Sequence, residues 1–65
     1  MKHIGKINFY NGKYGTIVTE TEVVDFSKKD ISFNQEISVG DTVEFRLENK
    51  FPDIKIARNI NKISQ

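Results

Sequence analysis

Hydrophobic and polar residues alternate with a period of two along several stretches of this chain. The clearest is Thr42–Glu48, where Val43, Phe45 and Leu47 share one face and the intervening residues are polar or charged. Successive side chains of a β-strand point to opposite faces of its sheet, so this pattern predicts a strand with one buried face. Apolar residues at helical spacing do not continue far enough to predict a substantial helix.

Four further strands are predicted from segments rich in β-branched and aromatic residues. They cover residues 2–10, 14–19 and 23–26, and a last segment that begins at Ile54 and continues towards Ile60 and Ile63. Closure into a barrel removes exposed strand edges, which favours a barrel over an open sandwich. We therefore expect an all-β fold, a small five-stranded antiparallel barrel, with residues 1–65 as a single domain.

Turn residues separate these segments. Asn11-Gly12 favours a two-residue type I′ hairpin, because both turn positions of that type need positive φ. Ser27–Asp30 has the pattern of a capped helical turn, and Gly40-Asp41 marks a turn before the fourth strand.

The composition narrows the range of possible functions. The chain has no cysteine and one histidine, which excludes disulfides and thiolate metal sites and leaves few nucleophile–base pairs. His3 is the third residue, and a free amino terminus, two backbone amides and a histidine at this position can bind Cu(II) or Ni(II) in square-planar geometry. An incidental histidine is the favoured interpretation. We expect no enzymatic activity, no metal and no cofactor. The chain shows neither a signal peptide nor an apolar run of about 18 residues, so we expect a cytoplasmic protein without membrane contact. We also expect the protein to be a monomer.

Charge is distributed unevenly along the chain, although the net charge is only +1. Residues 1–18 carry a net charge of +3, residues 19–48 carry −5, and residues 49–65 carry +3. If the two ends of the chain lay side by side, they would form one basic face.

An aromatic cluster stands out in the segment Asn8–Val18, "NFYNGKYGTIV", which contains Phe9, Tyr10 and Tyr14. Strict alternation places Phe9 on the same face as Ile7, which should be buried. A β-bulge in the first strand would instead allow Phe9 to be exposed.

Several segments, in order along nearly the whole chain, resemble the bacterial cold-shock domain, a five-stranded OB-fold barrel. Gly5–Asn11 resembles the family's first strand, G-x-V-K-W-F-N. The second and third strands, K-G-F-G-F-I and F-V-H-F-S, correspond to Gly12–Ile17 and Val23–Ser27. The family's L-x-E-G-Q-x-V-E-F and A-x-N-V are similar to Ile37–Phe45 and Ala57–Ile60.

This resemblance implies binding of single-stranded RNA or DNA, in the manner of an RNA chaperone. Exposed aromatic side chains would stack on bases, and neighbouring cationic side chains would contact phosphates. The residues implied for this site are Lys6, Asn8, Phe9, Tyr10, Lys13, Tyr14, Thr16, Phe26, Phe33 and Arg58.

The chain departs from the family's aromatic pattern at Thr16, Val23 and Asp25, and Asp25 would repel phosphate. Two alternatives therefore remain open. The first is an OB-fold module that binds another protein and has lost most nucleic-acid binding. The second is a ribosome-associated OB-fold factor similar to translation initiation factor one.

Overall fold

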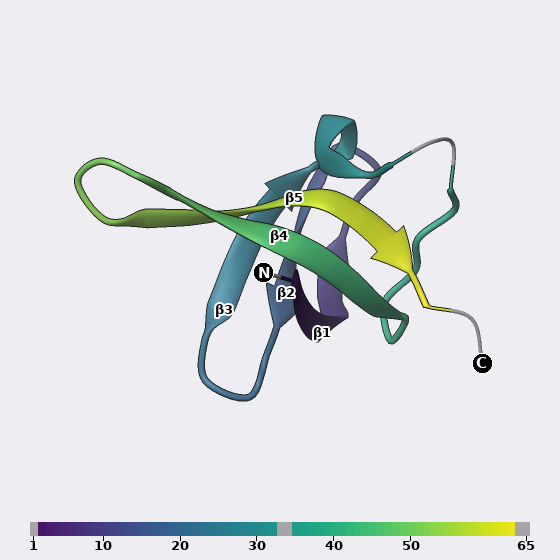
Figure 1. Cartoon of the computed structure of the whole chain (residues 1–65). Helices are drawn as coiled ribbons and strands as arrows, with labels where there is room; N and C mark the ends of the chain where they lie inside the picture. The colour runs from purple at the N-terminus through teal and green to yellow at the C-terminus, as the bar shows by residue number, and fades with distance from the viewer. Residues whose placement is uncertain (1, 33–34, 64–65) are drawn as a thin grey trace.

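The computed structural model describes residues 2–32 and 35–63. These residues form five strands and one short 3-10 helix (Figure 1). The elements are β1 (Lys2–Tyr10), β2 (Tyr14–Val18), β3 (Val23–Ser27), η1 (Lys28–Asp30), β4 (Thr42–Lys50) and β5 (Ile54–Lys62). The predicted all-β class and the predicted strand segments are confirmed. No helix among these residues combines the length and the apolar character needed to cross a membrane.

The strands close into an OB-like barrel in the order β1-β2-β3-β5-β4, with β4 returning to pair with β1. Most neighbouring strands are antiparallel, but β3 and β5 run parallel where Asp25 pairs with Ile56. The prediction of a purely antiparallel barrel is therefore wrong. The chain leaves β3 through η1 and crosses to β4 before β5 returns, which brings β5 beside β3 in the same direction.

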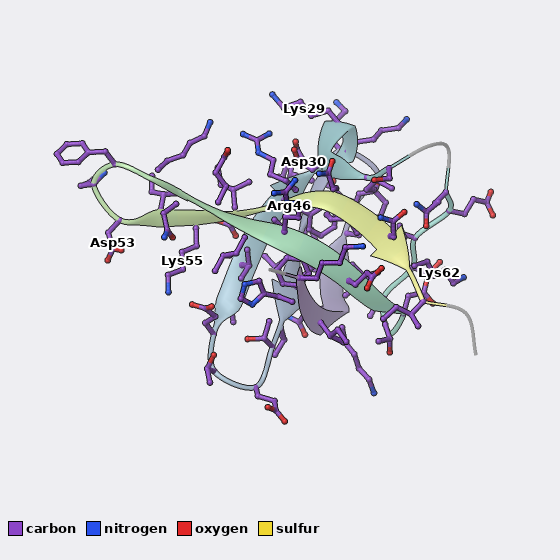
Figure 2. The ribbon with its side chains drawn as sticks, in the orientation of Figure 1. Lys29, Asp30, Arg46, Asp53, Lys55 and Lys62 are labelled. Carbon is purple, nitrogen blue, oxygen red and sulfur yellow. The ribbon has the colours of Figure 1, made fainter. Side chains whose placement is uncertain are left out.

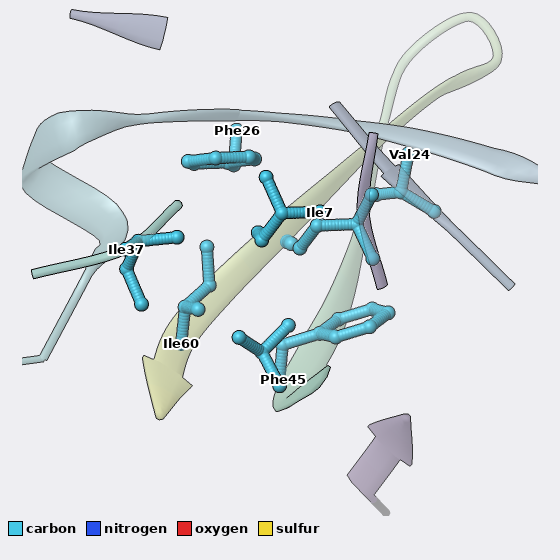
Figure 3. Packing of buried hydrophobic residues seen from close by; sticks show 9 residues of the cluster. Ile7, Val24, Phe26, Ile37, Phe45 and Ile60 are labelled. Atoms are coloured by element: carbon cyan, nitrogen blue, oxygen red, sulfur yellow. The ribbon is translucent and has the colours of Figure 1, made fainter. Parts of the chain in front are cut away.

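The barrel interior is filled by apolar side chains from every strand (Figure 3). The pattern predicted for the fourth strand is confirmed, since Val43 and Phe45 are buried and Leu47 packs against the core. The buried apolar residues are Ile7, Ile17, Val24, Phe26, Ile37, Val43, Phe45, Ala57 and Ile60. Their removal from water supplies the main stabilisation of so small a domain.

A β-bulge interrupts the alternation of β1. Ile7 pairs with Ile17 and Phe9 pairs with Thr16, so Asn8 is an extra residue in the first strand. Ile7 is buried, whereas Asn8 and Phe9 are both exposed. The bulge changes the side of the sheet to which Phe9 points, and it leaves the next residue, Tyr10, packed against the core.

The hairpin between β1 and β2 forms at Asn11-Gly12, but its turn is not type I′. Gly12 has a φ of 93°, whereas Asn11 does not adopt positive φ. The side-chain Oδ1 of Asn11 instead accepts hydrogen bonds from the backbone N–H groups of Lys13 and Tyr14, at 2.9 and 3.0 Å. An asparagine side chain thus replaces part of the backbone hydrogen bonding of the turn.

The predicted helical turn after the third strand is confirmed as η1. Its last residue, Asp30, accepts hydrogen bonds through Oδ2 from the backbone N–H and the hydroxyl of Ser27, both at 3.0 Å. These bonds satisfy groups at the start of the turn and hold Asp30 against the barrel.

The far part of the β4–β5 hairpin projects from the barrel as a two-stranded ribbon (Figure 1). Asp53 and Lys55 lie on this projecting part (Figure 2). Phe51, in the turn that joins the two strands, is 96% exposed.

Candidate nucleic-acid interface

Two exposed aromatic side chains lie next to each other on the outer surface of β1 and β2. The ring centroids of Phe9 and Tyr14 are 6.2 Å apart, and the ring planes are inclined by 46°. Phe9 is 45% exposed and Tyr14 is 57% exposed. The bulge directs Phe9 outward, and Tyr14 lies at the outward-facing start of β2. Each ring therefore offers surface on which a planar group could stack.

The outer surface continues from Phe9 across the neighbouring strands. Phe9 pairs with Thr16 on β2, and Thr16 pairs with Asp25 on β3. Thr16 is half-buried and Asp25 is exposed. This row therefore has one aromatic side chain, then a small polar one, then a carboxylate. An anion approaching Phe9 meets increasing repulsion towards β3.

Phe26 does not belong to this surface. The prediction that it offers an exposed stacking face is wrong, because Phe26 is 3% exposed and points into the barrel. Tyr10 packs over it, with ring centroids 5.5 Å apart and planes inclined by 28°. Tyr10 is half-buried in this contact, which links the end of β1 to the core. Both rings therefore act in packing.

Arg58 is already engaged by two carboxylates. Its Nη1 lies 2.7 Å from Oδ1 of Asp30, and its Nε lies 2.9 Å from Oε1 of Glu48. Hydrogen bonds to Glu48 and Asp30 raise the pKa of the Arg58 guanidinium above its ordinary value. Asp30 lies at the end of η1 (Figure 2), and its side chain is almost fully buried. The predicted role of Arg58 as a phosphate contact is therefore not supported, because the guanidinium is used within the fold.

Three further predicted site residues, Lys6, Asn8 and Lys13, are exposed on the segment that carries the two aromatics. Lys6 and Asn8 are exposed on β1, on either side of the buried Ile7. Lys13 is exposed in the hairpin turn, immediately before Tyr14. Phe33 lies outside the described residues.

Lys28 is a cationic neighbour that the sequence reasoning missed. The backbone N–H of Lys28 donates to the carbonyl oxygen of Lys13 at 2.8 Å, which holds η1 against the β1–β2 turn. Ser27, the residue before it, pairs with Tyr14. Two exposed lysines from distant segments therefore flank the turn that precedes Tyr14. The pattern of a capped turn at Ser27–Asp30 could have indicated this position of Lys28, because the turn follows β3 and lies beside the first hairpin.

A shallow groove of about 290 Å³ is lined by residues of β3, η1, β4 and β5. Its lining includes Lys29, Lys50, Ile56 and the Arg58–Asp30 pair. Within the residues that the structure describes, no three histidine, cysteine, aspartate or glutamate side chains gather as metal ligands.

The two basic ends of the chain do not form one face. β4 lies between β1 and β5 in the barrel, and several basic side chains from the ends pair with acids of the middle segment. These pairs are Lys2–Glu44, Lys55–Glu22, Lys62–Asp41 and the contacts of Arg58 described above. Acids of the middle segment thus pair with cations of both end segments. Among the described residues, the positive charge near Phe9 and Tyr14 comes only from lysines close to them in the fold.

Comparison with known proteins does not assign the chain to a family: no family model matches it, and no match was found among curated proteins.

Proposed function

We propose that this protein binds single-stranded RNA or DNA in the cytoplasm, with Phe9 and Tyr14 stacking on bases. Lys6, Lys13 and Lys28 contribute cationic groups beside the two rings. The binding is of the kind implied by the resemblance to cold-shock domains, in which stacking tolerates many base sequences and suits an RNA chaperone.

The observation that carries this proposal is the exposed Phe9–Tyr14 pair on the outer surface of an OB-like barrel. Burying an aromatic side chain stabilises a small domain, and two neighbouring exposed rings forgo this stabilisation. Exposed apolar rings that lie together are typical of an interaction site. Phe9 and Tyr14 belong to the first hairpin. The bulge in β1 and the turn at Asn11-Gly12 determine the direction in which the two rings point.

The affinity should be modest. Each base–aromatic stack contributes about 1–3 kcal/mol, and this surface offers two rings where a full cold-shock surface would offer more. With a few phosphate contacts, we expect a Kd of roughly 10–100 μM for a short oligonucleotide at low salt.

Titration with dye-labelled oligo-dT and oligo-U at two salt concentrations tests the proposal, with fluorescence anisotropy of the oligonucleotide as the readout, because this signal does not depend on Tyr14. Phe9→Ala and Tyr14→Ala should each weaken binding by about tenfold. Phe51→Ala is the matched control, since it removes an exposed aromatic ring remote from this surface and should leave the Kd unchanged. Absence of saturable binding below about 100 μM, or wild-type affinity of Tyr14→Ala, would contradict the proposal.

The same surface also supports a second candidate, a protein-binding module. Val18 and Val23 are exposed and pair with each other on β2 and β3, near the carboxylate of Asp25. Exposed aliphatic side chains beside an acid suit a protein surface better than a nucleic acid. Capture of a partner from nuclease-treated extract, lost on Val23→Asp and retained by Phe51→Ala, would favour this function.

A further inference from the structure

The edge of β4 is only partly covered by β1. The two strands pair from Lys6 with Thr42 to Lys2 with Arg46. β4 continues to Lys50, and β5 pairs with it over that whole length. In the described part of the chain, Leu47–Lys50 therefore has a neighbouring strand on one side only. An uncovered edge of this kind presents backbone groups to which another strand can pair.

The backbone of β4 determines which groups face this edge. The carbonyl of Thr42 accepts a hydrogen bond from Ile63, on the side of β5, at 2.9 Å. The irregularity in the β4–β5 ladder adds its extra residue to β5, because Glu44 pairs with Asn61 and Arg46 with Arg58. β4 itself is regular, so its backbone groups alternate in direction along the strand. Leu47 and Asn49 consequently direct their N–H and C=O groups away from β5, towards the open edge.

We propose that two copies of this chain pair through this edge as an antiparallel dimer, with the two-fold axis at Asn49. The sequence Leu47-Glu48-Asn49-Lys50-Phe51 is complementary to itself about this axis. Glu48 of each copy then lies opposite Lys50 of the other, and Leu47 lies opposite Phe51. A two-fold interface requires this kind of self-complementarity, because the same surface is used by both subunits.

The hydrogen-bonding pattern of the proposed dimer brings the side chains of Glu48 and Lys50 from the two copies close together. Asn49 would exchange backbone hydrogen bonds with its own counterpart across the axis. Glu48 and Lys50 would then form the non-hydrogen-bonded pairs, in which facing side chains approach most closely. Charged residues on an edge usually prevent pairing with another chain, but here the axis brings opposite charges together.

Phe51 gives the second reason for choosing another copy as the partner. The side chain is 96% exposed, and Leu47 is partly exposed at the side of the core. In the dimer, the side chains of Leu47 and Phe51 from the two copies would cover each other. Because the paired segment is short, the interface is small, and we expect a Kd of about 10 μM to 1 mM. The monomer expected from the sequence is then the state at low concentration.

Charge exchange between two variants tests the dimer. Lys50→Glu leaves two acids at the edge, and Glu48→Lys leaves two bases, so neither variant should self-associate. Glu48→Lys also removes the contact of Glu48 with Arg58 of its own chain, at 2.9 Å, so circular dichroism must show that this variant is folded. An equimolar mixture should dimerise, because every cross-axis pair is then oppositely charged. Sedimentation velocity of the wild type, each variant and the mixture, up to about 1 mM, measures this. Lys29→Glu is the control, since it makes the same charge change outside the edge and should dimerise like the wild type.

Asn49→Pro provides an independent test. The N–H of Asn49 faces the open edge, so its loss removes no ladder bond within the chain but prevents pairing across the axis. This variant should remain monomeric, with circular dichroism confirming that it is folded. A monomeric wild type at about 1 mM would overturn the proposal and leave the edge to a different partner. A mixture that does not associate, or a folded Asn49→Pro that still dimerises, would also overturn it.

Discussion

Gly15 lies directly against the carbonyl oxygen of Phe9, so that a Cβ atom on Gly15 would clash with this oxygen. The same Cβ would lie 2.9 Å from Cζ of Phe26. Gly15 is therefore enclosed between the bulged strand that exposes Phe9 and the ring that fills the barrel. The absence of a side chain here allows one aromatic residue to face outward while another packs inside.

Substitution of Gly15 by alanine should lower the free energy of unfolding by about 2–3 kcal/mol, because the backbone of Phe9 must move to admit a methyl group. Urea unfolding measures the change. Gly40→Ala is the control: Gly40 has a φ of 97° but open space around it, so only the cost of about 1 kcal/mol for positive φ is expected. Equal destabilisation by the two variants would contradict the close packing of Gly15.

Alanine substitutions at Phe26 and Tyr14 should lower the free energy of unfolding by very different amounts. Phe26→Ala removes a ring from the core and should cost about 3–5 kcal/mol of unfolding free energy. Tyr14→Ala removes an exposed ring and should cost less than about 1 kcal/mol. Chemical denaturation of both variants distinguishes the two positions. A Phe26→Ala protein as stable as the wild type would contradict the burial of this ring.

Asp30 should be the most sensitive carboxylate in the fold. Its side chain accepts bonds from two groups of Ser27 and from Arg58 while being almost fully buried. Asp30→Ala leaves these donors without their acceptor and should cost about 2–3 kcal/mol. Glu44→Gln, in the exposed 3.4 Å pair with Lys2, should change stability by less than about 0.5 kcal/mol. Thermal unfolding of the two variants provides the comparison.

The Lys55–Glu22 pair should make a small contribution that disappears at high pH. The side chains lie 2.6 Å apart, and the hydrogen bond to Glu22 raises the pKa of Lys55 above its ordinary value of 10.5. A raised pKa in the folded state stabilises the fold below the ordinary pKa, and this effect is lost as the pH rises through the raised value. Glu22→Gln should therefore lower Tm slightly at neutral pH, with a smaller difference above pH 10.5. A difference that grows with pH would contradict this assignment.

Asp25 should limit the affinity for nucleic acid. Its carboxylate lies in the same row as Phe9, and removing the charge should strengthen binding by about two- to fivefold at low salt. Asp25→Asn tests this prediction in the oligonucleotide titration at two salt concentrations. Glu20→Gln makes the same charge change in the exposed β2–β3 turn and should alter the Kd less. If the two variants bind the oligonucleotide equally, the affinity depends only on the net charge of the protein. The position of Asp25 in the same row as Phe9 then has no specific effect.

The strands were predictable because their evidence is local. Alternation around Phe45 indicated which face of β4 is buried, and Ser27–Asp30 indicated a capped turn. The type I′ turn was predicted wrongly because the Asn11 side chain supplied a hydrogen-bond acceptor that dihedral preferences do not represent. The parallel β3–β5 pairing was missed because it depends on how the chain closes the barrel.

The sequence by itself determined the all-β class, the strand segments and the aromatic segment near the first hairpin. These follow from side-chain periodicity and turn residues, which act over a few positions. The tertiary structure decided which aromatics are exposed: the bulge turned Phe9 outward, and closure of the barrel buried Phe26. It also drew Arg58 into contact with Asp30 and Glu48 and brought Lys28 beside Lys13. Burial and pairing of these side chains depend on contacts between residues far apart in the chain, which no local pattern specifies.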